Sequence, residues 1–349
     1  MANKSNTNPA PMTAEEIRDK YNGGRKIIDF IGKKKIFFIV SLAIIGVGII
    51  CNFIFGTTLD IQFSGGATLT YSYTGDINHE ELDSFIQEHT SARITTAYST
   101  DLLGNTGNNI SVQFSGDYNI DEKATGDEAK KSNVVEIQKN LTADLQSKYP
   151  DNNFKMLEAN SVDPSMGLSF LFKCLTAVAI ASILMVIYVF IRFRVIGGLS
   201  AGVMALVALF HDIAMIYFLY VILRMPIDSS FIAVVLMILG YSLNDTIVIY
   251  DRVREQKKLM GQGVDTATLF NVSCTKTIRR TIMTSVTTFA AILTVYVVAS
   301  VFNISSVKSF ALPMMIGVIS GCYSSICIAG PLWVMWQNRK AAKAKAESK

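Results

Sequence analysis

Six long apolar runs constrain what this sequence can fold into more than any other feature. Each is about 20 residues or longer, the length that a helix needs to cross roughly 30 Å of hydrocarbon. Half of the 349 residues are hydrophobic and only 17% are charged, whereas a soluble domain has about 25% charged residues. The sequence therefore predicts a polytopic α-helical membrane protein with six transmembrane helices, rather than a soluble protein with six buried helices. The runs lie at 36–55, 171–191, 198–222, 229–250, 281–302 and 309–336.

Basic residues predict the orientation, because loops rich in Lys and Arg stay in the cytoplasm. Four alternate segments hold 22 of the 32 basic residues, and Arg224 and Lys308 are isolated in the opposite short loops. We therefore expect a multi-pass protein of the cell inner (plasma) membrane with both termini cytoplasmic. The expected units are a cytoplasmic segment 1–35, a first helix 36–55, an external domain 56–160, a five-helix domain 171–336 with a cytoplasmic loop 251–278, and a basic tail 337–349.

The segment 56–160 has the composition of a soluble domain, with sixteen acidic and seven basic residues. Alternating apolar residues predict strands and helical spacing predicts two helices, the first capped by Asn78. The resulting βαββαβ order is typical of a ferredoxin-like α+β domain. We expect strands at 60–73, 92–98, 109–115 and 154–159, helices at 79–90 and 127–149, and a turn around 104–107.

Three stretches carry a family resemblance. The first is Leu59-Asp60-Ile61-Gln62-Phe63-Ser64-Gly65-Gly66, a variant of a D-F-x-G-G form. The second runs from Gly240 to Glu255 and includes Asp251-Arg252, and the third joins Asn271-Val272-Ser273 to the segment 277–281. Together they resemble the SecF members of the SecD/SecF family, which belongs to the resistance-nodulation-division superfamily. The resemblance covers nearly the whole chain. Its motif residues here are Asp60, Phe63, Gly65, Gly66, Gly240, Asp251 and Arg252.

The resemblance implies a subunit of the Sec protein-export machinery. Such a subunit uses the proton-motive force to promote export of unfolded polypeptides on the outer side of the SecYEG channel. The implied partners are a separate SecD chain, the SecYEG translocon, unfolded preprotein and membrane lipids. The net charge of +4 follows from the basic cytoplasmic loops and indicates no nucleic acid. The alternatives are a small-molecule/proton antiporter of the same superfamily, expected to have twelve spans, and a purely structural assembly subunit.

Asp245 and Arg280 are the leading candidates for chemistry, because a charged side chain within a bilayer is costly and needs a reason. They enter the membrane at one depth on consecutive spans, so a protonatable carboxylate could pair there with a guanidinium that keeps its proton. The resemblance implies a functional Asp and Arg at these two positions. Arg279 is an alternative partner, and Asn244 adjoins Asp245 but points about 100° away on a helix. The alternative for Asp245 is an interfacial acid.

Two further groups of polar residues within the spans have two possible roles each. His211-Asp212, midway along the third run, belongs either to a proton path or to a structural polar contact. Thr281, Thr284 and Thr288 share a helix face that could line a water path or join helices. We also expect close helix packing at Gly317-xxx-Gly321. Asp251, Arg252, Arg254 and Glu255 are expected to form a charge cluster that fixes the end of the fourth span.

The sequence has no pattern that indicates an enzyme. It lacks the G-x-x-x-x-G-K-[ST] phosphate-binding motif, and no Ser-His-Asp or Cys-His arrangement is supported. Its five cysteines and three histidines show no metal-ligand spacing. We therefore expect a transport protein without cofactor or metal, driven by protons, with sodium as the alternative coupling ion.

Overall fold

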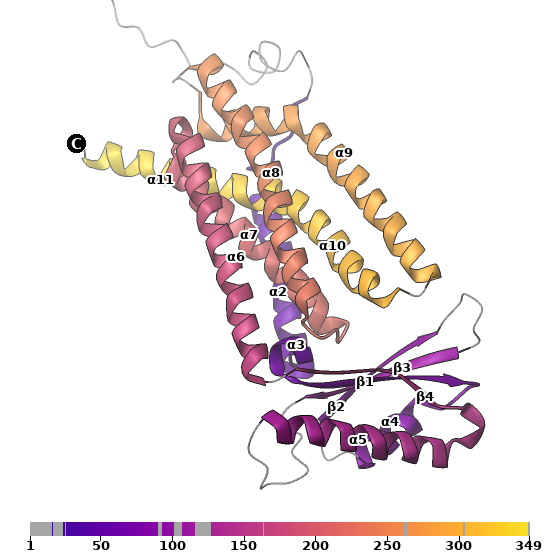
Figure 1. Ribbon diagram of the computed structural model, residues 1–349. Coiled ribbons are helices and arrows are strands. Elements are labelled where there is room, and N and C mark those ends of the chain that lie inside the picture. Colours follow the sequence, from indigo (N-terminus) through magenta and orange to yellow (C-terminus); the bar gives the residue numbers. More distant parts are fainter. Residues whose placement is uncertain are drawn as a thin grey trace, which may run out of the picture.

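The computed structural model describes Glu16, Gly24 and residues 26–89, 93–100, 107–115, 127–162, 164–261, 264–302 and 304–347. Six helices in the described part are long and apolar enough to cross a membrane. They pack as a bundle, and a small α/β domain lies at one end of it (Figure 1). This arrangement confirms the expected six spans with one domain between the first and the second. The expected turn at 104–106 lies outside the described residues.

The six spans extend beyond the apolar runs at several ends. The long helices α8 and α9 begin at aspartate caps, where Asp228 accepts the backbone N–H of Phe231 and Asp265 accepts that of Ala267. Only residues 261–265 separate these two helices, so the expected loop 251–278 is largely helical. The spans are α2 (Lys34–Phe55), α6 (Pro164–Arg192), α7 (Gly198–Ile222), α8 (Ser229–Met260), α9 (Thr266–Val301), and α10 (Ser305–Ser324) continued by a π-helical segment (Ser325–Ala329) and α11 (Gly330–Glu347).

The α/β domain has the expected ferredoxin-like order. Its elements are β1 (Gly66–Thr74), α4 (His79–His89), β2 (Arg93–Thr100), β3 (Gly107–Ser115), α5 (Asp127–Lys148), a 3-10 turn (Pro150–Asn152) and β4 (Lys155–Val162). The sheet is antiparallel with the order β2-β3-β1-β4. Alternate β1 side chains such as Leu69 and Tyr71 pack on Leu82 of α4 and Leu145 of α5. Both helices therefore cover one face of the sheet, and the other face is turned toward the bundle (Figure 1).

The strand expected from residue 60 begins only at Gly66. Asp60 instead caps a short helix, α3 (Ile61–Ser64), and its Oδ1 accepts the N–H of Gln62 at 2.9 Å. Gly65 and Gly66 follow with φ of +73° and +138°, a backbone that favours glycine. A Cβ on Gly66 would also collide with the carbonyl oxygen of Phe114. The strand starts later than expected because an aspartate cap and two glycines redirect the chain from a helix into the sheet.

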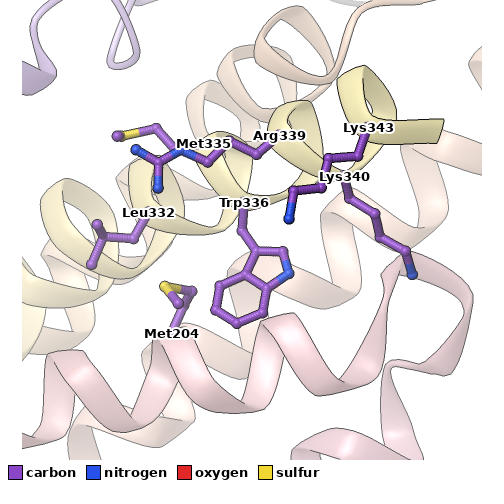
Figure 2. A pocket seen from close by; sticks show the side chains of 7 residues that line it. All are labelled: Met204, Leu332, Met335, Trp336, Arg339, Lys340 and Lys343. Carbon is purple, nitrogen blue, oxygen red and sulfur yellow. The ribbon is translucent and has the colours of Figure 1, made fainter. Parts of the chain in front are cut away.

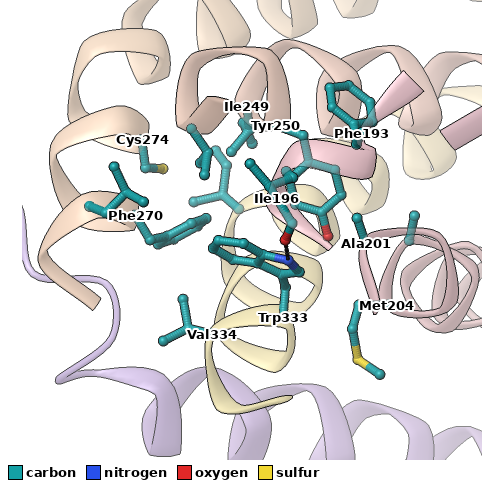
Figure 3. Close-up of a cluster of buried hydrophobic side chains, with 14 of the residues drawn as sticks. Phe193, Ile196, Ala201, Met204, Ile249, Tyr250, Phe270, Cys274, Trp333 and Val334 are labelled. Atoms are coloured by element: carbon teal, nitrogen blue, oxygen red, sulfur yellow. Dashed lines mark hydrogen bonds between the residues drawn. The ribbon is translucent and has the colours of Figure 1, made fainter. Parts of the chain in front are cut away.

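Large aromatic residues fill the bundle at the end remote from the α/β domain. Trp333 of α11 lies among Phe193, Tyr250 of α8 and Phe270 of α9, all of them buried (Figure 3). The Trp333 Nε1–H donates to the carbonyl oxygen of Ile196 at 3.3 Å. This cluster joins α8, α9 and α11 to the turn between α6 and α7.

Candidate functional site

Two buried carboxylates lie inside the helix bundle. Asp212 of α7 is 0% exposed and Asp245 of α8 is 2% exposed. Both were predicted from the sequence as candidates, Asp245 as the leading one. Their surroundings differ, and that difference defines the site.

Asp212 is surrounded by hydroxyl donors from two neighbouring helices. Its Oδ2 accepts from Ser242 of α8 and from Ser324 of α10, each at 2.7 Å, and its Oδ1 accepts from Ser320 of α10 at 2.6 Å. We call these three residues the serine cage. The Nδ1 of His211 lies 3.3 Å from Oδ1, while its Nε2 is buried with no partner in the described part of the chain. The cage ties α7, α8 and α10 together at one point.

Asp245 has no comparable set of donors. Its Oδ2 is buried without a hydrogen-bond partner among the described residues. The Oγ1 of Thr281, on the neighbouring α9, is buried and unpartnered in the same way. The adjacent Thr246 side chain is engaged elsewhere, 2.9 Å from the hydroxyl of Ser325. Asp245 is therefore a buried acid with unused hydrogen-bonding capacity, and the neighbouring helix α9 also has a buried hydroxyl without a described partner.

The three residues predicted to lie near Asp245 are all exposed. Asn244 is exposed on α8, as the 100° step between consecutive helical residues requires. Arg279 and Arg280 are both exposed on α9. No hydrogen bond or ion pair joins Asp245 to either arginine, all three being residues that the structure describes. The helices α8 and α9 pack together, but the predicted ion pair is not formed among these residues.

The buried hydroxyl face of α9 differs from the predicted one. Its buried hydroxyl residues, at a spacing of four, are Ser273, Thr277, Thr281 and Ser285. Thr284, expected on the inner face, donates instead to a carbonyl oxygen of its own helix, that of Arg280, at 2.9 Å. Of the expected set, Thr281 alone is among the buried residues.

A π-helical segment lies next to both carboxylates. It begins at Ser325, whose hydroxyl donates to the carbonyl oxygen of Ser242 at 3.0 Å. Added Cβ atoms would collide with Ile238 at Gly317 and lie 3.0 Å from the Cβ of Ser242 at Gly321. The expected close packing at these glycines is therefore confirmed. Such π-helical segments are often found at functional sites.

The motif residues Asp60 and Phe63 join the α/β domain to the bundle. Asp60 Oδ2 accepts from the Gln113 side chain of β3 at 2.9 Å, and the Asp60 N–H donates to the carbonyl oxygen of Ile227, between α7 and α8, at 3.0 Å. Phe63 is fully buried and stacks on Phe170 of α6, with ring centroids 5.5 Å apart. We call Asp60–Gly66 the joint. Sequence reasoning found these residues as a motif but missed Gln113, which no pattern marked.

The remaining motif residues lie along α8. Asp251 pairs with Arg192 of α6 and with Arg254, each at 2.9 Å, and Arg252 pairs with Glu255. This confirms the expected charge cluster at the end of the fourth span. Gly240 is exposed, and a Cβ added there would meet nothing within 4 Å.

Comparison with known families gives one match over more than half of the chain. Residues 142–339 match the family model described as protein export membrane protein SecD/SecF, C-terminal. The SecF subunit of Petrotoga mobilis is 31% identical over 91% of this chain and 99% of its own length. That of Borreliella burgdorferi is 32% identical over 88% of this chain and 97% of its own length.

Longer relatives contain a matching region as one part. The SecDF protein of Bacillus subtilis is 30% identical over 91% of this chain, and the match spans 39% of that protein. A crystal structure of SecDF from Thermus thermophilus superposes with a TM-score of 0.71 at 26% identity, over 93% of this chain and 41% of that one. A SecDF structure in a super-membrane-facing form gives a TM-score of 0.58 at 25% identity, over 93% and 40%. This chain thus spans about two fifths of these SecDF proteins.

Proposed function

The chain belongs to the SecD/SecF family of protein export membrane proteins, and on this premise we propose that it couples the proton-motive force to polypeptide export. The single observation that carries the proposal is the buried Asp245 carboxyl, whose Oδ2 lacks a partner among the described residues. The protein would act on unfolded preprotein on the outer side of a SecYEG channel. Its termini would lie in the cytoplasm, as the basic loops predict.

An unpartnered carboxylate is costly inside a membrane bundle, so Asp245 needs either a proton or a cation that comes to it. The candidate cation predicted from the sequence is Arg280 on α9, which is exposed in this structure. We propose that the structure represents the state in which Asp245 carries a proton. After the proton leaves, rotation of α9 would bring Arg280, or Arg279, toward the carboxylate.

Asp212 would have a different part in the same cycle. Three hydroxyl donors satisfy its two oxygens, and charge-assisted hydrogen bonds of this kind are strong. We propose that Asp212 fixes α7, α8 and α10 as the unit against which α9 moves. A proton-carrying role for Asp212 remains the alternative, and the experiment below separates the two.

The joint offers a route from the spans to the α/β domain. Phe63 packs among residues of α7, α8 and α10, including Ile216 and Ile238, while Asp60 is bonded to the sheet through Gln113. A shift of α7, α8 and α10 as one unit relative to α9 would therefore displace the sheet, because the joint is held at both ends. Repeated displacement outside the membrane could hold or pull an emerging polypeptide.

A SecD partner would complete the bundle. Asn244 is an exposed polar residue within a span, and Gly240, one turn before it, has open space around it. Polar and small residues on one helix face are typical of contacts between membrane helices. The fused SecDF relative supports SecD as the chain that covers this face.

The test measures preprotein translocation into inverted membrane vesicles containing the complex. Asp245→Asn keeps the shape of the side chain but cannot titrate, so we expect translocation to fall to the level of the wild type treated with a protonophore. Glu255→Gln is the matched control, because it removes a carboxylate from the same helix at an exposed ion pair. Replacing sodium by potassium tests the alternative coupling ion.

Normal gradient-dependent translocation by Asp245→Asn would overturn the proposal. If Asp212→Asn instead abolished the gradient dependence with the complex intact, Asp212 would be the proton carrier. Co-purification of the complex with each variant separates loss of coupling from loss of assembly.

A further inference from the structure

A cavity of about 400 Å³ opens beside α11, at the end of the bundle remote from the α/β domain. Figure 2 shows its lining, which has an apolar part and a cationic part. The apolar residues come from α7 and the first turns of α11, and the cations come from the following turns. The lining consists of Met204, Leu332, Met335, Trp336, Arg339, Lys340 and Lys343.

The spacing of these residues separates the two chemistries along one helix face. Leu332, Trp336, Lys340 and Lys343 recur at three or four residues, so they stack along one side of α11. Met204 of α7 is 8% exposed and closes the floor, whereas Trp336 is 40% exposed at the opening. An apolar floor therefore leads directly to a group of three cations.

Hydrogen bonds on an adjacent face of α11 hold this helix against the start of α7. The Gln337 side-chain nitrogen donates to the carbonyl oxygen of Ile196 and to the hydroxyl of Ser200, both at 2.8 Å. Trp333 donates to the same carbonyl oxygen. A ligand would thus meet a preformed site, which reduces the entropic penalty of binding.

The three basic residues of the lining, which we call the rim, have no acidic partners in the described part of the chain. Arg339, Lys340 and Lys343 make no ion pair with any residue that the structure describes, although nearby Arg252 and Arg254 do so on α8. The rim lies where the apolar part of the last span gives way to its polar end. An anionic group at the membrane surface would supply the missing negative charge.

We propose that this cavity binds an anionic phospholipid. Its phosphate group would contact Arg339, Lys340 and Lys343, and the start of an acyl chain would lie against Trp336 and Met335. Tryptophan is favoured at this depth because its ring spans the apolar and polar zones. A soluble anion would bind to the basic residues but leave the apolar floor in contact with water. The combination of an apolar floor and a basic rim therefore favours a lipid.

Trp336 provides the readout, since the chain has only two tryptophans and Trp333 is 2% exposed. The full chain is reconstituted in phosphatidylcholine nanodiscs, and fluorescence quenching is compared for brominated phosphatidylglycerol and brominated phosphatidylcholine. We expect stronger quenching by the anionic lipid at equal mole fraction. Trp336→Phe should remove the quenched component, which assigns it to the cavity.

The triple variant Arg339→Gln, Lys340→Gln, Lys343→Gln should lose the preference for phosphatidylglycerol. The loss is up to about 100-fold in relative affinity, because each basic residue at an anionic surface contributes about fivefold. The matched control is Lys33→Gln, Lys34→Gln, Lys35→Gln, which removes three cations near the start of α2, where no described cavity residue lies. The control should keep the preference.

Three results would overturn the proposal. Equal quenching by the two lipids in the wild type would show that no anionic lipid is selected. An equal loss in the Lys33–Lys35 control would show general attraction to the surface rather than a site. Suppression of the preference by millimolar inorganic phosphate would assign the rim to a free anion.

Discussion

Asp212 and Asp245 are carboxylates of the same type, buried to almost the same degree on two packed helices, but they have opposite hydrogen-bonding environments. Asp212 accepts three serine hydroxyls, whereas the Oδ2 of Asp245 has no partner among the described residues. A buried polar group with its bonds made stabilises one arrangement, and one without them favours change. On this basis we propose that Asp212 holds the helices in place and that Asp245 is the residue that changes its state during coupling.

The largest expected effect is on stability, and it separates the two acids directly. Asp212→Leu removes the acceptor of three buried hydroxyls, each of which then costs about 1–3 kcal/mol. Asp245→Leu removes a carboxyl with an unsatisfied oxygen, so the change should lie within about 1 kcal/mol of zero or be stabilising. Thermal unfolding of the two purified variants in one detergent measures the difference.

Equal destabilisation by both leucine variants would break this comparison. It would mean that Asp245 has a partner in solution that satisfies it as fully as the serine cage satisfies Asp212. Asp245→Asn, which keeps the shape and one acceptor oxygen and adds an amide donor group, would then be expected to restore part of the lost stability.

Removing single hydroxyl groups tests the difference between Asp212 and Asp245 through smaller changes in the free energy of unfolding. Ser320→Ala and Ser324→Ala should each lower the free energy of unfolding by about 1 kcal/mol, the usual net value of one hydrogen bond. Thr281→Val is the matched control on α9, because its Oγ1 is buried without a described partner. It should leave the unfolding temperature unchanged, and a loss as large as that of the serine variants would contradict the assignment.

The smallest expected effect concerns a third acid, Asp29. Its pKa predicts the direction in which the docking of the segment around it changes with pH. The backbone N–H of Gly32 holds the pKa of Asp29 below its usual range, and the Asn271 side chain adds to this. Residues 26–32 dock on α9, where the N–H of Ile28 donates to Thr275 Oγ1 and that of Phe30 to Asn271 Oδ1, both at 3.0 Å. A lowered folded pKa means that this docking is favoured above the unfolded pKa. The docking then weakens as the pH falls through the folded value.

The mobility of a spin label at position 26 reports this docking. The label should become more mobile at acid pH in the wild type, and Asp29→Asn should remove the pH dependence. A mobility that rises with increasing pH would contradict the sign.

Most of the fold could be predicted from the sequence because its signals are local. The apolar runs and the alternation in Gly66–Thr74 are local patterns, and a charge inside an apolar run marks Asp245. The serine cage could not be found in this way, since Ser320 and Ser324 lie more than 100 residues from Asp212. Helical spacing also left open which hydroxyls of α9 face inward, because the choice depends on the neighbouring helix. The Asp60 cap was overlooked since Ile61 and Phe63 also fit a strand.

The central claim is that Asp245, and not Asp212, changes its protonation state during coupling. Infrared difference spectroscopy of the reconstituted complex, recorded across a pH step, measures protonated carboxyl groups directly. We expect a protonated carboxyl band that responds to the step, is absent in Asp245→Asn and persists in Asp212→Asn. A band that persists in Asp245→Asn and disappears in Asp212→Asn would contradict the claim.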